Sequence, residues 1–303
     1  MKHRLLPVLM TIESLHFLLT YECNFECDHC FVWGSPENKG VMKLSQIEEI
    51  LRQAGETGKI RGICVEGGEP FLYYPILLWT LKRARGLGFE AGVVTNCYWA
   101  TAVEDAKEWL RSIPEVDISD LGLSEDYFHY EKERNPEFAK EAADKLGIPH
   151  STISIEDPRE EISAREGMMM LKGRAAEKIA PDIPKKPWQS FTECLDEDFS
   201  NQKRVHIDPF GFVHVCQGIV IGNLFERSLR SIFEEFDPNK HPICGPLLEG
   251  GPAKLVEVYG VRHAKEYADE CHLCYDLRCR LRTEFPDLLC PDQMYGVQDS
   301  SKV

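Results

Sequence analysis

Residues 15–30 read Leu-His-Phe-Leu-Leu-Thr-Tyr-Glu-Cys-Asn-Phe-Glu-Cys-Asp-His-Cys, an apolar run followed directly by three closely spaced cysteines. The apolar run predicts a buried β-strand. Cys23, Cys27 and Cys30 can hold three corners of an iron–sulfur cube, for which four cysteines are normally needed. The fourth iron would lack a nearby protein ligand, and an incomplete ligand shell distinguishes a catalytic metal site from a closed structural one. A zinc site completed by His29 or by a distant residue is the alternative.

The composition of the whole chain restricts its location and its partners. The sequence has 303 residues, enough for one large domain or two smaller ones, and a formal net charge of −15. This acidity predicts no affinity for nucleic acid or for an anionic membrane surface. No apolar run reaches the roughly 18 residues that span a bilayer. Twelve clustered cysteines are typical of metal ligands in a reducing compartment, so we expect a cytoplasmic protein with no nucleic-acid or membrane partner.

Short apolar runs alternate with helical patterns between residues 15 and 155. We expect strands at residues 15–20, 61–66, 90–95, 116–123 and 150–155, and helices at residues 44–55, 76–87, 103–112, 136–146 and 160–171. Ser45 is the expected N-cap of the first helix, and Gly88 is expected to end the second. This alternation predicts an α/β fold with a parallel sheet. Five or six such units suggest a partial (β/α)6 version of the TIM-type barrel, with its active site at the C-terminal ends of the strands.

Polar or unusual segments follow four of the expected strands. The three cysteines follow the first strand, Gly67–Pro70 the second, Thr95-Asn96 the third and Ser124–Asp126 the fourth. Because the C-terminal ends of parallel strands share one rim, we expect these segments to surround one site. Glycines permit a close approach of the main chain to a ligand. Glu69 offers a fixed anion for an ammonium group, and Pro70 stiffens the turn.

The strand–helix alternation stops near residue 180, where a proline-rich stretch forms a plausible linker. We therefore expect two domains, residues 1–180 and 181–303. In the second, residues 204–208 and 212–216 predict a hairpin. Seven cysteines lie in this part of the chain: Cys194, Cys216, Cys244, Cys271, Cys274, Cys279 and Cys290. The two-residue gap between Cys271 and Cys274 allows two thiolates to bind one metal centre.

The motif Cys23-x-x-x-Cys27-x-x-Cys30, followed by Gly67-Gly68-Glu69-Pro70, resembles the radical S-adenosylmethionine (radical SAM) superfamily over roughly residues 15–155. The resemblance implies a [4Fe–4S] cluster on the three cysteines, whose open iron binds the amino and carboxylate groups of the cofactor. It implies that Gly67, Gly68, Glu69 and Pro70 meet the amino group. Asn96 and either Ser124 or Asp126 then correspond to contacts with the ribose or the methionyl carboxylate. His29 occupies a position near the adenine that is commonly aromatic in the family.

The later cysteines, with Gly211–Cys216 and Gly222–Leu224, resemble the C-terminal extension called SPASM or its shorter relative, twitch. The resemblance implies an auxiliary [4Fe–4S] cluster with Cys194, Cys216, Cys271 and Cys274 as ligands. A second auxiliary cluster is an alternative, although Cys279 and Cys290 depart from the usual spacing. A zinc or purely structural site is another, and Cys244 can replace one of the four ligands.

The family resemblance implies an oxidoreductase-type enzyme that cleaves S-adenosylmethionine reductively to a 5′-deoxyadenosyl radical, which abstracts a hydrogen atom from a substrate. We expect a peptide or small-molecule substrate, an oxidative outcome, and a reducing partner such as flavodoxin or ferredoxin. The competing class is a non-catalytic electron-transfer or cluster-scaffold protein, which needs no Gly-Gly-Glu-Pro loop. Asp126, Tyr127 and His129 are candidates for a catalytic relay, with a loop packed by its aromatic side chains as the alternative.

Overall fold

The computed structural model describes residues 11–130, 132–159 and 169–297. In this part of the chain the main sheet has eight strands in the spatial order β5-β4-β3-β2-β1-β7-β8-β9. Their bounds are Ser14–Leu18 (β1), Gly62–Glu66 (β2), Glu90–Thr95 (β3), Asp120–Ser124 (β4), His150–Ile153 (β5), Arg204–Ile207 (β7), Phe212–Cys216 (β8) and Ile219–Asn223 (β9). Neighbouring strands from β5 to β7 are parallel, whereas β8 and β9 are antiparallel. The predicted α/β class with a mostly parallel sheet is confirmed.

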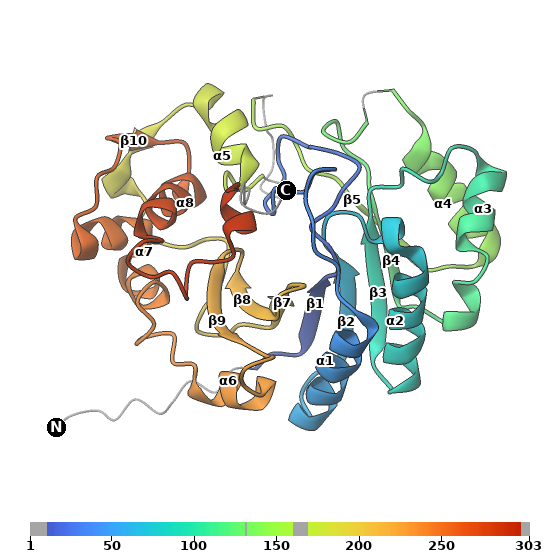
Figure 1. Ribbon diagram of the computed structural model, residues 1–303. Coiled ribbons are helices and arrows are strands. Elements are labelled where there is room, and N and C mark those ends of the chain that lie inside the picture. The colour runs from blue at the N-terminus through green and yellow to red at the C-terminus, as the bar shows by residue number, and fades with distance from the viewer. Residues whose placement is uncertain (1–10, 131, 160–168, 298–303) are drawn as a thin grey trace.

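Helices connect the first five strands and lie along the outer face of the sheet (Figure 1): α1 (Leu44–Thr57), α2 (Tyr74–Gly86), α3 (Val103–Leu110) and α4 (Asn135–Leu146). The prediction of Ser45 as N-cap is wrong. The helix begins at Leu44, and the Gln46 side chain accepts a 2.8 Å hydrogen bond from the backbone N–H of Lys43, which stabilises the earlier start. The helix expected at residues 160–171 falls mostly outside the described residues, and residues 169–171 are not helical.

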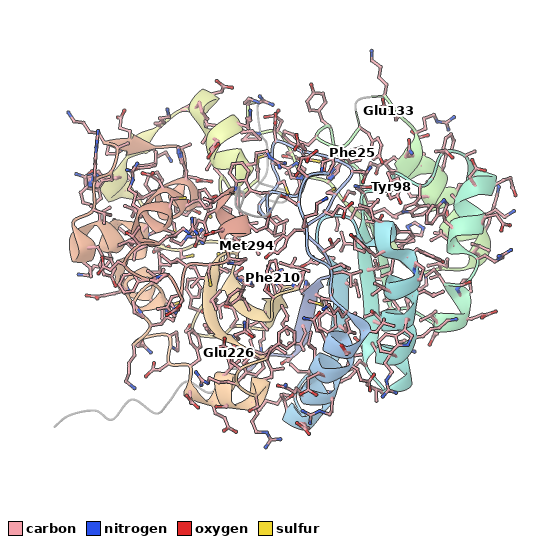
Figure 2. The ribbon with its side chains drawn as sticks, in the orientation of Figure 1. Phe25, Tyr98, Glu133, Phe210, Glu226 and Met294 are labelled. Atoms are coloured by element: carbon pink, nitrogen blue, oxygen red, sulfur yellow. The ribbon has the colours of Figure 1, made fainter. Side chains whose placement is uncertain are left out.

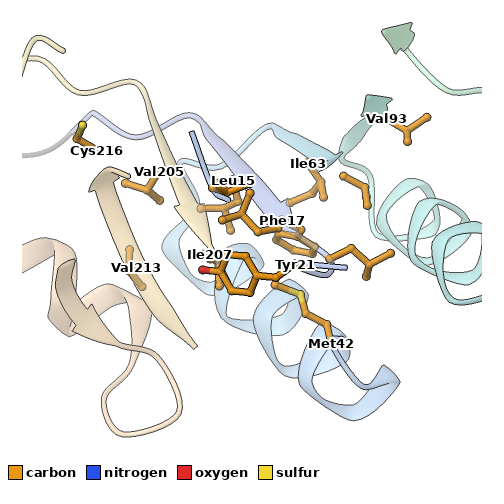
Figure 3. Close-up of a cluster of buried hydrophobic side chains, with 14 of the residues drawn as sticks. Leu15, Phe17, Tyr21, Met42, Ile63, Val93, Val205, Ile207, Val213 and Cys216 are labelled. Carbon is orange, nitrogen blue, oxygen red and sulfur yellow. The ribbon is translucent and has the colours of Figure 1, made fainter. Parts of the chain in front are cut away.

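The two faces of the sheet differ in the side chains that they carry. The outer face is apolar and packs against the helices, and Leu15, Phe17, Ile63 and Val93 belong to this core (Figure 3). Because side chains alternate along a strand, the inner face carries the residues between them. Most of these are small or polar: Ser14, His16, Cys64, Glu66, Gly92, Asp120, Gly122, Ser124 and Ser151. The apolar Leu18, Val94 and Ile153 lie on the same face. This face borders a cavity of about 310 Å³, described below, and so leaves room for a ligand rather than for a second core.

Strand β7 joins the second part of the chain to the first. It forms the predicted hairpin with β8. It also pairs in parallel with β1, so that Ser14 lies opposite Arg204 and His16 lies opposite His206. The main sheet is therefore continuous across residue 180.

The rest of the second part gathers on one side of the sheet, at the left in Figure 1. It contains α5 (Arg174–Lys178), α6 (Leu229–Glu235), α7 (Cys244–Tyr259), α8 (Glu270–Leu281) and a small antiparallel pair, β6 (Lys186–Pro187) with β10 (Glu266–Tyr267). Helices α7 and α8 pack against each other. Among the helices of the described residues, none combines the length and the apolar character needed to cross a membrane.

Candidate active site

The cysteine loop follows β1 and lies at the C-terminal rim of the parallel strands. Phe25 of this loop and Tyr98 of the loop after β3 are found at the same rim (Figure 2). Cys23, Cys27 and Cys30 line one cavity of about 310 Å³. Backbone N–H groups point at two of the sulfurs, from Phe25 to Cys23 Sγ at 3.4 Å and from Gly34 to Cys30 Sγ at 3.1 Å. Hydrogen bonds of this kind stabilise the thiolate ligands of iron–sulfur clusters.

The glycines of the Gly-Gly-Glu-Pro segment allow the loop after β2 to pack against the cysteine loop. Gly67 has a φ of +141°, and a Cβ there would lie 2.5 Å from the carbonyl oxygen of Thr20. A Cβ on Gly68 would lie 2.0 Å from the carbonyl oxygen of Glu22. The backbone N–H of Gly68 donates to Thr20 O at 2.7 Å. Only glycine fits at either position, and both glycines line the cavity.

Glu69 and Pro70 lie behind the wall of the cavity rather than in its lining. The fully buried Glu69 carboxylate accepts hydrogen bonds from the backbone N–H groups of Phe71 (2.9 Å) and Asn96 (2.7 Å), and from the Thr95 hydroxyl (2.8 Å). Burial raises the pKa of Glu69 to about 7, against the lowering effect of these hydrogen bonds. In this structure the carboxylate therefore links the loops after β2 and β3, and Pro70 begins a short 3₁₀ turn.

Asn96 and Ser124 line the same cavity, as the rim argument predicted. The Asn96 side-chain amide donates to Asn24 Oδ1 at 2.9 Å and lies 3.6 Å from Cys23 Sγ. This contact connects the third loop directly to the cysteine loop.

The Asp126 and His129 side chains also reach the cavity and form a pair, with Asp126 Oδ1 2.8 Å from His129 Nδ1. The other carboxylate oxygen, Asp126 Oδ2, is buried without a hydrogen-bond partner among the described residues, and so is His29 Nδ1. The His29 ring lies 5.1 Å from the His129 ring. Tyr127, in contrast, is 60% exposed and lies outside the cavity lining. Buried polar atoms normally have partners, so these two atoms indicate a ligand that supplies them.

Two basic residues near the start of α5 also lie at the site. Lys172 precedes the helix and Arg174 is its first residue. The Arg174 guanidinium donates to the carbonyl oxygens of Cys27 and Gly34, each at 2.8 Å, and so fixes the part of the loop that contains Cys27 and Cys30. Lys172 lines the cavity, as do Met169 and Met170. Sequence analysis did not identify Lys172, because a lysine gives no local signal of burial.

The cysteines of the second set come from three separate segments. Cys194 lies in a loop, Cys216 ends β8, and Cys271 and Cys274 lie one helical turn apart on α8. All four line a second, smaller cavity together with Lys172, Asp196 and Arg278. Cys244 is buried beside this group, whereas Cys279 is exposed. The structure therefore brings the four predicted ligands together around one small cavity.

Two buried cations face this second set of cysteines. Lys172 Nζ lies 2.5 Å from Asp196 Oδ2 and 3.8 Å from Cys216 Sγ. Burial alone would lower the pKa of Lys172, but Cys216 and Asp196 raise it. Arg278 is 1% exposed, its Nη1 donates to Gln217 O at 2.5 Å, and its Nε has no partner among the described residues. A buried cation needs a compensating anion. Asp196 compensates Lys172, whereas no carboxylate pairs with Arg278 among the described residues, and a cluster held by four thiolates would carry the missing negative charge.

Comparison with known proteins finds a family match for the first part of the chain. Residues 17–155 match the model of the Radical SAM superfamily. A probable GTP 3′,8-cyclase of Pyrococcus abyssi is 31% identical over 109 residues, which cover 36% of this chain and 34% of that protein. An S-adenosylmethionine-dependent nucleotide dehydratase of Fibrobacter sp. is 27% identical over 97 residues, covering 29% of this chain and 28% of that protein. The matches thus span about a third of these relatives.

A solved structure shares the wider fold. BtrN in complex with AdoMet and 2-DOIA superposes with a TM-score of 0.51, covering 75% of this chain and 83% of that chain at 14% sequence identity. At this identity the likeness concerns the arrangement of helices and strands. It extends beyond the residues that match the superfamily model.

Proposed function

Because residues 17–155 contain a radical SAM domain, we propose that the protein is a radical SAM enzyme of the oxidoreductase type. Its substrate is a peptide or a small molecule that loses a hydrogen atom in an oxidative modification. The sheet forms an open, partial (β/α)6 barrel around the cofactor, and residues 181–303 form a SPASM/twitch-like domain that holds one auxiliary [4Fe–4S] cluster. The enzyme acts in the cytoplasm, where a flavodoxin or ferredoxin supplies electrons. None of the twelve cysteines forms a disulfide, which is consistent with a reducing compartment.

The observation that carries this proposal is the convergence of three thiols and two obligatory glycines on one cavity of about 310 Å³. Cys23, Cys27 and Cys30 would hold a [4Fe–4S] cluster, and the cavity leaves space beside it for a ligand. When bound, this cluster and S-adenosylmethionine together supply a 5′-deoxyadenosyl radical, which takes a hydrogen atom from the substrate. An electron carrier would need neither the space nor the glycine-lined wall.

The residues around the cavity bind and orient the cofactor. The main chain at Gly67 and Gly68 is exposed to the cavity and can meet an ammonium group closely. Asn96 and Ser124 present an amide and a hydroxyl to the ribose or the carboxylate. Asp126 Oδ2 is a buried acceptor that a hydroxyl or ammonium group can satisfy, and the His29 ring can lie against the adenine. The apolar side chains of Ile153, Ile155 and Met169 line the cavity and help to exclude water from it.

The second set of cysteines is proposed to hold the auxiliary cluster, with Cys194, Cys216, Cys271 and Cys274 as its four ligands. The buried charge of Arg278 supports this assignment, because four neutral thiols would leave it without a compensating anion, whereas Lys172 is paired with Asp196. Lys172 lines both cavities, so its side chain lies between the two sites. A redox centre so placed can accept an electron from a substrate radical, which favours an oxidative outcome.

The decisive experiment measures 5′-deoxyadenosine after anaerobic reconstitution with iron and sulfide, reduction, and addition of S-adenosylmethionine. The wild-type protein and a Cys97→Ala variant should both form it. Cys97 is a buried cysteine at the same rim that lies outside the cavity lining, and it is therefore a matched control. A Cys27→Ala variant should form none. Equal product from Cys27→Ala and wild type, or none from either, would leave the electron-carrier or scaffold function as the better account.

A further inference from the structure

A cluster of three side chains of the types that bind metals lies on the inner face of the sheet and contains no cysteine. His16 comes from β1, Glu66 from the last position of β2, and His206 from β7. His16 lies directly opposite His206 in the parallel pairing of β1 with β7, so the two imidazoles share a face. Glu66 pairs with Leu18, two positions farther along β1 than His16, and it therefore points to the same face as His16.

The side-chain atoms of this cluster converge on one point. Glu66 Oε1 lies 3.3 Å from His16 Nδ1 and 2.9 Å from His206 Nε2. One ligand atom from each residue lies within 4.8 Å of the others. The side chains are 22% (His16), 16% (Glu66) and 7% (His206) exposed, which means that the cluster is enclosed but reachable. Glu66 itself lines the cavity of about 310 Å³.

We propose that His16, Glu66 and His206 form a binding site for a divalent transition-metal ion in the wall of the active-site cavity. Two imidazole nitrogens and one carboxylate oxygen are a ligand set that suits Zn²⁺, Fe²⁺, Mn²⁺ or Co²⁺. The separations of about 3 Å between ligand atoms are those of neighbouring ligands around one ion whose bonds are about 2.1 Å long. The site contains no thiolate ligand, so it differs in chemistry from the sites of the clusters.

Three protein ligands leave at least one coordination position open. Because Glu66 lines the cavity, that position is available to an oxygen or nitrogen atom of a molecule bound there. The site would thus take a substrate that carries a hydroxyl, carboxylate or phosphate group and hold it by coordination. Each ligand belongs to a β-strand of one sheet, so the ligand positions are fixed before the metal binds.

The alternative is a purely structural hydrogen-bonded triad, in which both imidazoles donate to Glu66 Oε1. Zinc binding to the full-length, cluster-loaded protein distinguishes the two, because only a metal site would bind the ion. The bond lengths identify the ligands: about 2.0–2.1 Å for nitrogen and oxygen, and about 2.3 Å for cysteine sulfur. The protein is dialysed against micromolar Zn²⁺ under anaerobic conditions. Zinc per chain is then counted, and its first coordination shell is measured by X-ray absorption at the zinc edge.

We expect about one zinc ion per chain with a nitrogen and oxygen shell in the wild type, and an affinity at least about 100-fold lower in Glu66→Gln and His206→Gln. His150→Gln is the matched control, because His150 pairs with Asp144 at 3.0 Å at the edge of the sheet without a second imidazole. It should bind zinc as the wild type does. His16→Gln provides a third ligand variant should another fail to fold.

Three results would overturn the proposal: no zinc on the wild-type protein, a zinc shell dominated by sulfur, or unchanged zinc affinity in the folded ligand variants. The proposal does not depend on the activity proposed above. Zinc binding is measured without turnover, so failure of either assay leaves the other interpretable.

Discussion

The two sets of cysteines differ in how the chain assembles them. Cys23, Cys27 and Cys30 lie within eight residues on one loop, and they border a cavity of about 310 Å³. Cys194, Cys216, Cys271 and Cys274 are brought together from three segments, and buried cations surround them. In the proposed assignment, the first set leaves its ligand shell incomplete beside the larger cavity. The second set would supply all four ligands around a much smaller one.

This difference indicates that the two sets of cysteines have different roles. A contiguous loop at the rim of a sheet can hold a metal centre while it leaves one side open to a ligand. Four ligands from separate segments enclose their centre and tie those segments together. The first arrangement suits binding and chemistry, and the second suits electron transfer and the stability of the second part of the chain.

The largest expected effect comes from removing one ligand of the enclosed set. Cys274→Ala should lower the iron content by about four per chain, while the cleavage of S-adenosylmethionine at the first site persists. Iron analysis and 5′-deoxyadenosine formation measure the two outcomes.

Cys279→Ala is the control for this substitution, because Cys279 lies on the same helix but is exposed. It should retain all of its iron. Full iron content in Cys274→Ala would show that Cys274 is not a cluster ligand. Loss of cleavage in this variant would show that the two sets do not function separately.

A smaller effect is expected at the contact between the first two rim loops. Gly68→Ala would place a Cβ 2.0 Å from the Glu22 carbonyl oxygen, and the resulting backbone shift should destabilise the protein by about 3 kcal/mol and weaken binding of S-adenosylmethionine. Chemical denaturation and equilibrium dialysis measure these changes. Gly86→Ala, on α2, meets no atom within 4 Å and should stabilise the protein by about 0.5 kcal/mol. Equal stabilities for the two variants would contradict the packing described for the loops.

The smallest effect concerns the charge between the two sites. Lys172→Met removes a cation 3.8 Å from Cys216 Sγ. This loss should disfavour the reduced auxiliary cluster and so lower its midpoint potential by on the order of 100 mV. A redox titration followed by electron paramagnetic resonance (EPR) measures the potential. Lys172→Arg keeps the charge and should stay near the wild-type value, and an unchanged potential in Lys172→Met would exclude an electrostatic role for this lysine.

Much of the first site was predictable because its signals are local. The spacing of Cys23, Cys27 and Cys30, and the position of Gly67-Gly68 after a strand, need only the order of strands along the chain. The direction of the Glu69 side chain was not predictable. It depends on the hydrogen bonds that the carboxylate makes with Thr95 and Asn96 on the neighbouring loop.

The features that sequence analysis missed depend on long-range pairing. The burial of Lys172 requires Asp196, and Arg278 is buried only because the end of β8 and α8 come together. The His16, Glu66 and His206 cluster requires the pairing of β7 with β1, across 190 residues of chain. A hairpin pattern predicts how β7 pairs with β8, but it contains no information on which strand lies along its other edge.

The central claim, one open and one closed cluster, is tested most directly by EPR of the reduced protein before and after addition of S-adenosylmethionine. In Cys274→Ala, which keeps the first cluster, the added cofactor should change the signal, because the open iron becomes coordinated. In Cys27→Ala, which keeps the auxiliary cluster, the signal should stay the same. A cofactor-induced change in Cys27→Ala, or an unchanged signal in Cys274→Ala, would contradict the account.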